Sequence, residues 1–173
     1  MQPLSPTFFS QDTEIVAQKL LWKIIKVGDK SWVILETEAY KGLCDEASHA
    51  YPRQTPRNTL MYESFGKVYV YLIYGMHYCL NLTSDKEKPW AVLIRSIQDL
   101  ETWKIYDWPG KLTKYLWIDK KFNWISLSKS FPSIEKDLIV IFDDNIKLKN
   151  IQKTPRIWIK KATDKLWRFI WEY

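Results

Sequence analysis

The sequence predicts an α+β fold, in which one compact domain over residues 1–173 is built on a curved, mainly antiparallel β-sheet. Three observations lead to this prediction. A chain of 173 residues is long enough to bury one core of its own. Strand-like segments follow one another with short turns between them, and short helical patterns flank them. There is no internal repeat, low-complexity tract or linker, and a strong hairpin signal around Gly75 predicts a protruding β-hairpin.

The first forty residues contain a helix signal followed by a strand pair. Asp12 or Thr13 can cap a helix whose apolar residues, such as Val16 and Leu20, recur at helical spacing. Around this helix we expect an entry arm over 1–10, a strand over 21–27, a tight turn over 28–30 and a returning strand over 31–40.

The remainder of the chain reads as a long polar loop, a hairpin and shorter elements. Pro56 argues against helix within the loop over 41–59, and a loop of this length in a compact domain is often functional. The later strands are expected at 67–74, 76–83, 90–94, 138–142, 146–148, 156–159 and 167–171, and the later helices at 97–103 and 111–118.

Composition narrows the possible environments and partners. No apolar run approaches the ~18–20 residues that cross a membrane, and the N-terminus has no secretory pattern, so we expect a soluble, cytoplasmic, nucleoid-associated protein. Two cysteines do not indicate a disulfide framework. A net charge of +6 suits a polyanionic partner such as nucleic acid, and aromatic residues, 16% of the chain, suit both base stacking and core packing.

The stretch from Ser31 to His49 carries the first candidate for chemistry. Because side chains alternate along a strand, Glu36, Glu38 and Tyr40 share one face. Two carboxylates beside an aromatic ring can be the solvated face of an edge strand, which is the more common situation. The segments downstream favour a functional interpretation instead.

Four segments together resemble a known family. They are TEAY at 37–40, RQTPRN at 53–58, YVYLIYGMHYCLN at 69–81 and an arginine, Arg95, at the end of a strand. In this order they resemble the alkyladenine (3-methyladenine) DNA glycosylases of the bacterial type, which remove alkylated purines from DNA. The resemblance runs from about residue 5 to the C-terminus and is densest between Glu36 and Arg95.

The resemblance implies a catalytic pair. Breaking the bond between a purine and its sugar passes through an oxocarbenium-like state, so a carboxylate is needed to deprotonate water and balance positive charge. Glu38 matches that carboxylate, and Arg95 matches the arginine that positions it and its water. Glu36 is expected to be structural or to face solvent. Without the resemblance, Arg95 could equally form a salt bridge at a strand end.

The resemblance also implies a slot that receives an extruded base. Asn81 matches the residue that obstructs the exocyclic amine of normal guanine, although a hydrogen-bonded strand asparagine fits that position too. Tyr71 could instead be core, and His49 could pair with Asp45 or Glu46. The residues expected to line the slot are Tyr40, His49, Tyr71 and Asn81.

Contacts with DNA are expected at the hairpin tip and in the long loop. Tyr74, beside Gly75, matches the family's intercalating residue, whereas a tyrosine that merely caps a hairpin is the ordinary alternative. Lys67 and Lys111 are weaker candidates for phosphate contacts. The pocket wall and phosphate-contacting surface are expected to include Arg53, Thr55, Arg57 and Asn58.

No cofactor or metal is expected. The family uses none here, and the Cys-x4-His and His-x-Cys spacings of Cys44, His49, His77 and Cys79 are not those of structural zinc modules. The chain departs from the family pattern at Trp108, at Trp158, where bacterial relatives usually have glycine, and in a slightly shorter tail.

These observations predict a monofunctional glycosylase that acts as a monomer on double-stranded DNA containing damaged purines, of the 3-methyladenine, hypoxanthine or ethenoadenine type. Water is the expected nucleophile, and no lyase step is expected because no lysine stands in the motif for a Schiff base. One rival is a non-catalytic nucleic-acid-binding module that retains this fold. Another is a small-molecule nucleosidase, which would lack both the wedge and a strong salt dependence.

Overall fold

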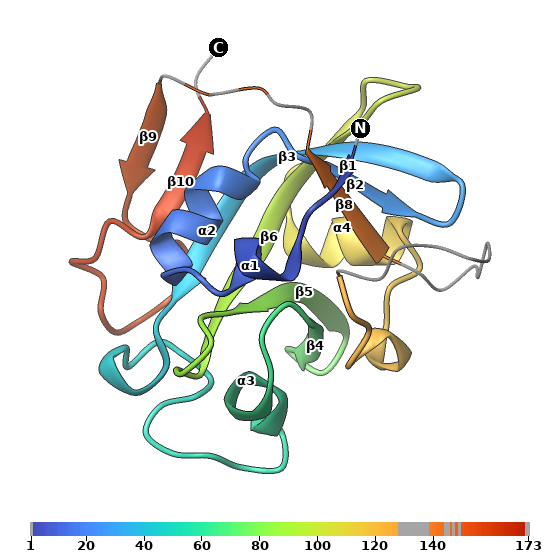
Figure 1. Ribbon diagram of the computed structural model, residues 1–173. Coiled ribbons are helices and arrows are strands. Elements are labelled where there is room, and N and C mark those ends of the chain that lie inside the picture. The colour runs from blue at the N-terminus through green and yellow to red at the C-terminus, as the bar shows by residue number, and fades with distance from the viewer. Residues whose placement is uncertain (1, 128–138, 144–145, 147, 149, 172–173) are drawn as a thin grey trace.

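The computed structural model describes residues 2–127, 139–143, 146, 148 and 150–171. Within these residues, ten strands form one sheet (Figure 1). The first half of the chain contains β1 (Gln2–Pro3), α1 (Pro6–Phe9), α2 (Thr13–Leu20), β2 (Ile24–Val27), β3 (Lys30–Tyr40), the 3-10 helix η1 (Gly42–Cys44), α3 (Thr59–Glu63), β4 (Val68–Ile73) and β5 (His77–Ser84). The second half contains β6 (Trp90–Asp99), β7 (Ile105–Tyr106), α4 (Pro109–Tyr115), the 3-10 helix η2 (Lys120–Phe122), β8 (Ile139–Asp143), β9 (Ile151–Thr154) and β10 (Arg168–Trp171).

The sheet is antiparallel at every described pairing, and its main path runs β1-β8-β2-β3-β6-β5-β4. One edge of β3 is shared by two partners, because β2 pairs with its first residues and β10 pairs with Glu36 to Glu38. A register shift between β3 and β6 falls at Ile34 to Thr37. Figure 1 shows β9 and β10 to one side of the long strands β3 and β6. The predicted α+β fold with a curved antiparallel sheet is confirmed.

The two faces of the central strands have different surroundings. Thr37 and Ala39 of β3, together with Val92 and Ile94 of β6, are buried, and the main core gathers on their side of the sheet. Helix α2 adds Val16, Ala17 and Leu20 to this core, helix α4 adds Leu112, and Leu116 follows directly after α4. Since side chains alternate along a strand, the residues between them face the opposite side, where the candidate site lies.

Several predicted elements are confirmed. Helix α2 begins after Asp12, whose carboxylate accepts a hydrogen bond from the N–H of Glu14 at 2.8 Å. The β4–β5 hairpin closes through Ile73 and His77, and its turn has positive φ at Tyr74 (52°) and Gly75 (70°). Glycine accepts this backbone conformation at no steric cost, whereas a tyrosine there is strained.

Other predicted elements are wrong. The segment 97–103 is not a helix: β6 continues to Asp99, whose carboxylate then accepts the N–H groups of Glu101 and Thr102 and forms a turn. Nor is 156–159 a strand, because the polar contacts of Arg156 hold it in a loop and Trp158 has a φ of 66°. In the predicted strand 146–148, Ile146 and Leu148 are not in a strand, and residue 147 lies outside the described residues.

Candidate active site

A cavity of about 370 Å³ opens on the face of the sheet opposite the main core. Residues in register across the strands share this face, so Tyr69 of β4, Asn81 of β5 and Leu93 of β6 lie in a row that ends at Glu38 of β3. The loop after Tyr40 and helix α3 close one side of the cavity through a small apolar cluster that includes Met61. The other walls come from residues 157–161 and from the start of α4.

Glu38 is fully buried, and every group that contacts its carboxylate lies at or beside the cavity. The Tyr40 hydroxyl donates to Oε2 at 2.8 Å, and the Ile157 N–H donates to Oε1 at 3.0 Å. Arg95 Nη1 lies 3.4 Å from Oε2. Tyr40, Arg95 and Ile157 all line the cavity. A carboxylate has about four acceptor positions, so Glu38 retains capacity for a water or a substrate group.

Burial raises the pKa of Glu38 above its ordinary value, and the nearby donors only partly offset this. Desolvation is the largest effect, while Arg95, the Ile157 N–H and the Tyr40 hydroxyl each lower the pKa. The neighbouring Glu36 raises it further. A carboxyl with a raised pKa is a better proton acceptor, which is the property that a general base near neutral pH needs.

Glu36 is buried and does not face open solvent. Its Oε1 accepts a hydrogen bond from Arg95 Nε at 2.9 Å and another from Arg168 Nε on β10. Arg95 therefore bridges the two carboxylates of β3, with Nε on Glu36 and Nη1 near Glu38. The solvent-facing alternative for Glu36 is wrong, and its structural role stays a prediction.

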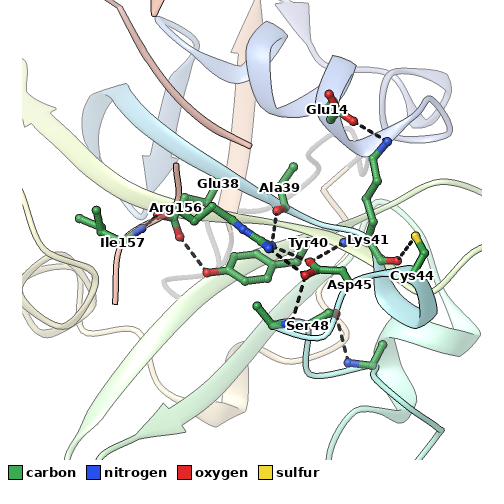
Figure 2. Close-up of polar contacts among 12 residues, drawn as sticks. Glu14, Glu38, Ala39, Tyr40, Lys41, Cys44, Asp45, Ser48, Arg156 and Ile157 are labelled. Atoms are coloured by element: carbon green, nitrogen blue, oxygen red, sulfur yellow. Dashed lines mark hydrogen bonds and ion pairs between the residues drawn. The ribbon is translucent and has the colours of Figure 1, made fainter. Parts of the chain in front are cut away.

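On the other side of Glu38, Arg156 and Asp45 form a fully buried ion pair. Figure 2 shows the guanidinium group joined to Asp45 and to the carbonyl oxygen of Ala39, which it reaches at 3.0 Å. Its central carbon also lies 4.5 Å from the centre of the Tyr40 ring. The sequence prediction missed both residues, because 111 positions separate them and nothing in the local pattern around either indicates a partner.

Three of the residues predicted to line the base slot form an aromatic and polar wall. The ring centres of His49 and Tyr71 lie 3.9 Å apart, and His49 Nδ1 lies 3.3 Å from the Tyr69 hydroxyl. Asn81 donates both amide hydrogens to the backbone carbonyls of Tyr69 and Cys79, each at 3.2 Å, which leaves its side-chain oxygen for a ligand. Together with Tyr40, these residues all line the cavity.

His49 is a neutral imidazole at neutral pH. Burial, followed by the positive charge of Arg57, lowers its pKa to about 4. Its expected alternative partners are engaged elsewhere, since Asp45 binds Arg156 and Glu46 lies 3.2 Å from Lys161 Nζ. Its neutral ring, which lies tilted by 59° against Tyr71, offers a flat surface for an aromatic ligand.

Tyr74 projects from the hairpin tip and also lines the cavity. Its side chain is 60% exposed, and Gly75 beside it has nothing within 4 Å of where a Cβ atom would lie. The tip is therefore open on its outer side. An exposed tip fits both the predicted intercalating residue and a tyrosine that merely caps the hairpin, so the role of Tyr74 stays a prediction.

The residues predicted to contact DNA in the long loop divide into two groups. Arg53, Thr55 and Arg57 are exposed, and Arg57 donates to the carbonyl oxygen of Leu72 at 2.7 Å. Asn58 is buried: it accepts the N–H of Thr55 at 2.6 Å and donates to the carbonyl oxygens of His49 and Arg53. Asn58 thus shapes the loop from within, and its contact with DNA stays a prediction.

The two tryptophans that depart from the family pattern both line the cavity. The ring of Trp108 covers Gly110, where a Cβ atom would come within 2.5 Å of it, and contacts the ring of His77. Trp158 is 72% exposed with a φ of 66°, so a glycine is the residue this backbone favours. The cost of a tryptophan at position 158 is therefore backbone strain and not crowding against the sheet.

In the described part of the chain, no three His, Cys, Asp or Glu side chains come together as metal ligands. Cys44 is exposed, and its thiol donates to the carbonyl oxygen of Lys41. Cys79 is buried in the cavity wall, and this burial raises its pKa to about 11.

No described helix is long and apolar enough to span a bilayer.

Comparison with known proteins places this site in a family. The profile of the methylpurine-DNA glycosylases (MPG) matches residues 7–173. A protein of Sodalis glossinidius is 44% identical over 96% of this chain and 95% of its own length. A protein of Rickettsia peacockii (strain Rustic) is 41% identical over 97% of this chain and 89% of its own length. Both are provisionally named 3-methyladenine DNA glycosylases.

The chain therefore belongs to the methylpurine-DNA glycosylase family. The family and the names of these relatives support a DNA glycosylase of base excision repair, as the sequence motifs predicted.

Proposed function

We propose that this protein is a monofunctional DNA glycosylase that removes damaged purines of the 3-methyladenine, hypoxanthine or ethenoadenine type from double-stranded DNA. The observation that carries the proposal is the buried Glu38 carboxylate, which is held by Arg95, Tyr40 and the Ile157 N–H beside an aromatic cavity. Family membership and the names of the relatives support the same activity.

In the proposed reaction Glu38 acts as the general base. As the C1′–N9 bond breaks, the purine leaves with the bonding electrons, the water oxygen bonds to C1′, and Glu38 takes the proton of the water. The carboxylate also balances the positive charge that develops on the sugar. Arg95 orients Glu38 without neutralising it, because it is shared with Glu36.

The cavity is proposed to receive the base after the nucleotide rotates out of the duplex. Its volume of about 370 Å³ is within the usual range of ligand pockets. Tyr71 and His49 offer stacking surfaces, and the Asn81 side chain is proposed to obstruct the exocyclic amine of normal guanine. Tyr74 is proposed to fill the gap left in the duplex.

The cationic side chains of the long loop, Arg53 and Arg57, are proposed to contact phosphates on either side of the extruded nucleotide, and Lys67 and Lys111 are weaker candidates. Such contacts hold the protein in register on DNA and do not read sequence. We propose that the protein acts as a monomer, because one chain supplies the carboxylate, the cavity and the wedge.

Base release from defined duplexes tests this function. Duplexes that each carry one 3-methyladenine, 7-methylguanine, hypoxanthine or ethenoadenine are incubated with the protein, and abasic sites are then cleaved with alkali. We expect alkali-dependent cleavage at one or more of these lesions. Strand cleavage without alkali would indicate a lyase step and contradict the monofunctional proposal.

The same assay separates the rival functions. A non-catalytic nucleic-acid-binding module would bind the duplexes and release no base. A small-molecule nucleosidase would release base from free nucleosides and show little preference for DNA. Either result would overturn the proposed function.

A further inference from the structure

The candidate mechanism does not use the buried pair Arg156–Asp45, although Arg156 directly precedes one of the groups that hold Glu38. Both side chains have no exposed surface. Asp45 lies in the loop after β3, and Arg156 lies between β9 and β10. Both Asp45 oxygens accept from the guanidinium, and Asp45 also accepts the N–H groups of Lys41 and Ala47, each at 3.1 Å.

Arg156 lies next to two of the three donors that reach Glu38. The first is the N–H of Ile157, its neighbour in the chain, which lies 3.0 Å from Glu38 Oε1. The second is the hydroxyl of Tyr40, whose ring lies against the guanidinium at 4.5 Å. In Figure 2 the Arg156 guanidinium lies beside the Tyr40 ring, and a dashed line joins the Tyr40 hydroxyl to Glu38. The third donor, Arg95, is held independently by Glu36.

A purely stabilising role does not account for this arrangement well. Taking two charges out of water costs several kcal/mol, and a buried pair often contributes no more stability than an apolar replacement. Arg156 also leaves its Nε atom buried without a hydrogen-bond partner. The contacts it does make converge on Ala39 and Tyr40 of β3, next to Glu38.

Resting on the glycosylase function proposed above, we propose that Arg156, locked by Asp45, is a positioning residue. It fixes the orientation of the Glu38 carboxylate by holding the Ile157 N–H and the Tyr40 ring. Arg156 does not touch the substrate. Arg156 acts on the reaction only through these two donors. Its loss therefore makes the orientation of the Glu38 carboxylate less fixed, while the walls of the base pocket remain.

The test uses two conservative variants, Asp45→Asn and Arg156→Lys, and measures single-turnover base release on a lesion duplex as a function of pH. We expect a loss of about 10- to 100-fold near neutral pH, since a shift of about 1 Å can cost 10²-fold. Affinity for lesion DNA should change by less than about threefold, because the pocket walls remain.

The pH profile distinguishes positioning from general destabilisation. Hydrogen bonds to the charged carboxylate lower the pKa of Glu38, so their loss raises that pKa and moves the acid limb of the rate profile to higher pH. The other groups that face Glu38 from the surrounding elements stay in place, and they are Glu36, Tyr71, Cys79, Arg95 and Arg168.

Asp99→Asn is the matched control. Asp99 is also a buried carboxylate with several donors, including the Tyr115 hydroxyl at 2.8 Å, but it lies at the far end of β6 and does not line the cavity. It should lower the melting temperature without moving the acid limb. If Asp45→Asn and Arg156→Lys fold but keep the wild-type rate and acid limb, Arg156 is not a positioning residue.

The proposal and the underlying function fail differently. A wild-type protein that releases no base from any lesion duplex contradicts the glycosylase function itself. An active wild type whose Asp45→Asn variant loses melting temperature, as Asp99→Asn does, with no shift of the acid limb contradicts only the positioning role. Tyr40→Phe removes one of the two donors and should therefore produce a smaller shift in the same direction.

Discussion

At the scale of single residues, the site depends on two carboxylates of one strand that are placed in different surroundings. Glu38 is buried beside the cavity and held by groups that line it, whereas Glu36 lies between Arg95 and Arg168. Arg95 is the only cation in direct contact with Glu38 among the described residues. It also forms an ion pair with Glu36, so the two carboxylates share one guanidinium group. Burial raises the pKa of Glu38, Arg95 only partly offsets this, and the charge of Glu36 raises the pKa further.

Glu36→Gln should reduce base release, though much less than Glu38→Gln does. Without the Glu36 charge, the pKa of Glu38 falls, because Glu36 now raises it and draws Arg95 away. The acid limb of the rate profile should therefore move to lower pH, opposite in direction to the shift expected for Asp45→Asn. Single-turnover rates between about pH 4 and 8 measure this. Equal losses from Glu36→Gln and Glu38→Gln would contradict the separate roles.

Tyr74→Ala tests the wedge at the hairpin tip. Unstacking a base costs a few kcal/mol per step, so the variant should slow excision most from well-paired lesions such as ethenoadenine in a duplex. On single-stranded substrates the loss should be small. Excision rates on paired and single-stranded lesions measure the difference, and equal slowing on both would place Tyr74 in the pocket function.

The stability of Tyr74→Ala serves as its control. The tyrosine is 60% exposed, so its removal should change the free energy of unfolding by no more than about 0.5 kcal/mol. We expect residue 74 to keep its positive φ in the variant, because the turn that it forms with Gly75 is unchanged. A large drop in melting temperature would mean that the ring packs in the folded protein.

At the scale of elements, the unusual use of tryptophan falls on turns and loops. Five of the ten tryptophans, all of which the structure describes, have positive φ, where L side chains are strained. The chain has only five glycines. These five tryptophans are Trp22, Trp103, Trp117, Trp124 and Trp158. We have no functional account of Trp117, which is 85% exposed and lies outside the cavity lining.

Trp158→Gly and Trp117→Gly should both stabilise the fold. Each relieves about 1–2 kcal/mol of backbone strain, less about 0.5–1 kcal/mol for the greater freedom of glycine in the unfolded chain. A net gain of about 1 kcal/mol raises the melting temperature by about 2–4 °C in a domain of this size. Thermal unfolding measures it, and a lower melting temperature in both variants would contradict the strain.

Elements that depend on neighbouring residues could be predicted from the sequence. The hairpin around Gly75 and the strand through Glu38 follow from alternation and turn residues that lie close together in the chain. Strand β6 was predicted too short because the turn that ends it depends on Asp99 accepting N–H groups beyond it. The loop at Arg156 depends on Asp45, 111 positions away, and no local pattern carries that information.

The candidate site shows the same limit. The motifs indicated Glu38, Arg95 and the cavity wall because the family resemblance placed them, and the structure brings them together. The burial of Glu36 and of Asn58 could not be predicted, since each depends on partners that fold against it. A strand pattern shows which residues share a face but not which face another element covers.

At the scale of the whole molecule, one face of the sheet holds the fold together and the other holds the cavity. The core side packs α2 and α4 against apolar residues of β3, β5 and β6, whereas the cavity side keeps buried charge and aromatic rings. The whole chain carries a net charge of +6. Binding to DNA should therefore draw on long-range attraction as well as on the pocket.

The salt dependence of binding tests that expectation. The logarithm of the association constant for undamaged duplex should fall linearly with the logarithm of salt concentration, with a slope of about −0.9 for each phosphate neutralised. Arg57→Gln should reduce the slope by about one such unit. Fluorescence anisotropy over a range of salt concentrations measures both, and a nearly flat response would favour a nucleosidase.

The most direct measurement is single-turnover base release by Glu38→Gln on the lesion duplex that the wild type processes best. The substitution keeps the shape of the side chain and removes the base, so the rate should fall by at least about 10²–10⁴-fold. Binding to the same duplex should remain close to wild type, because Tyr71, His49 and Tyr74 are unchanged. A Glu38→Gln protein that releases base at the wild-type rate would contradict the assignment of Glu38 as the general base.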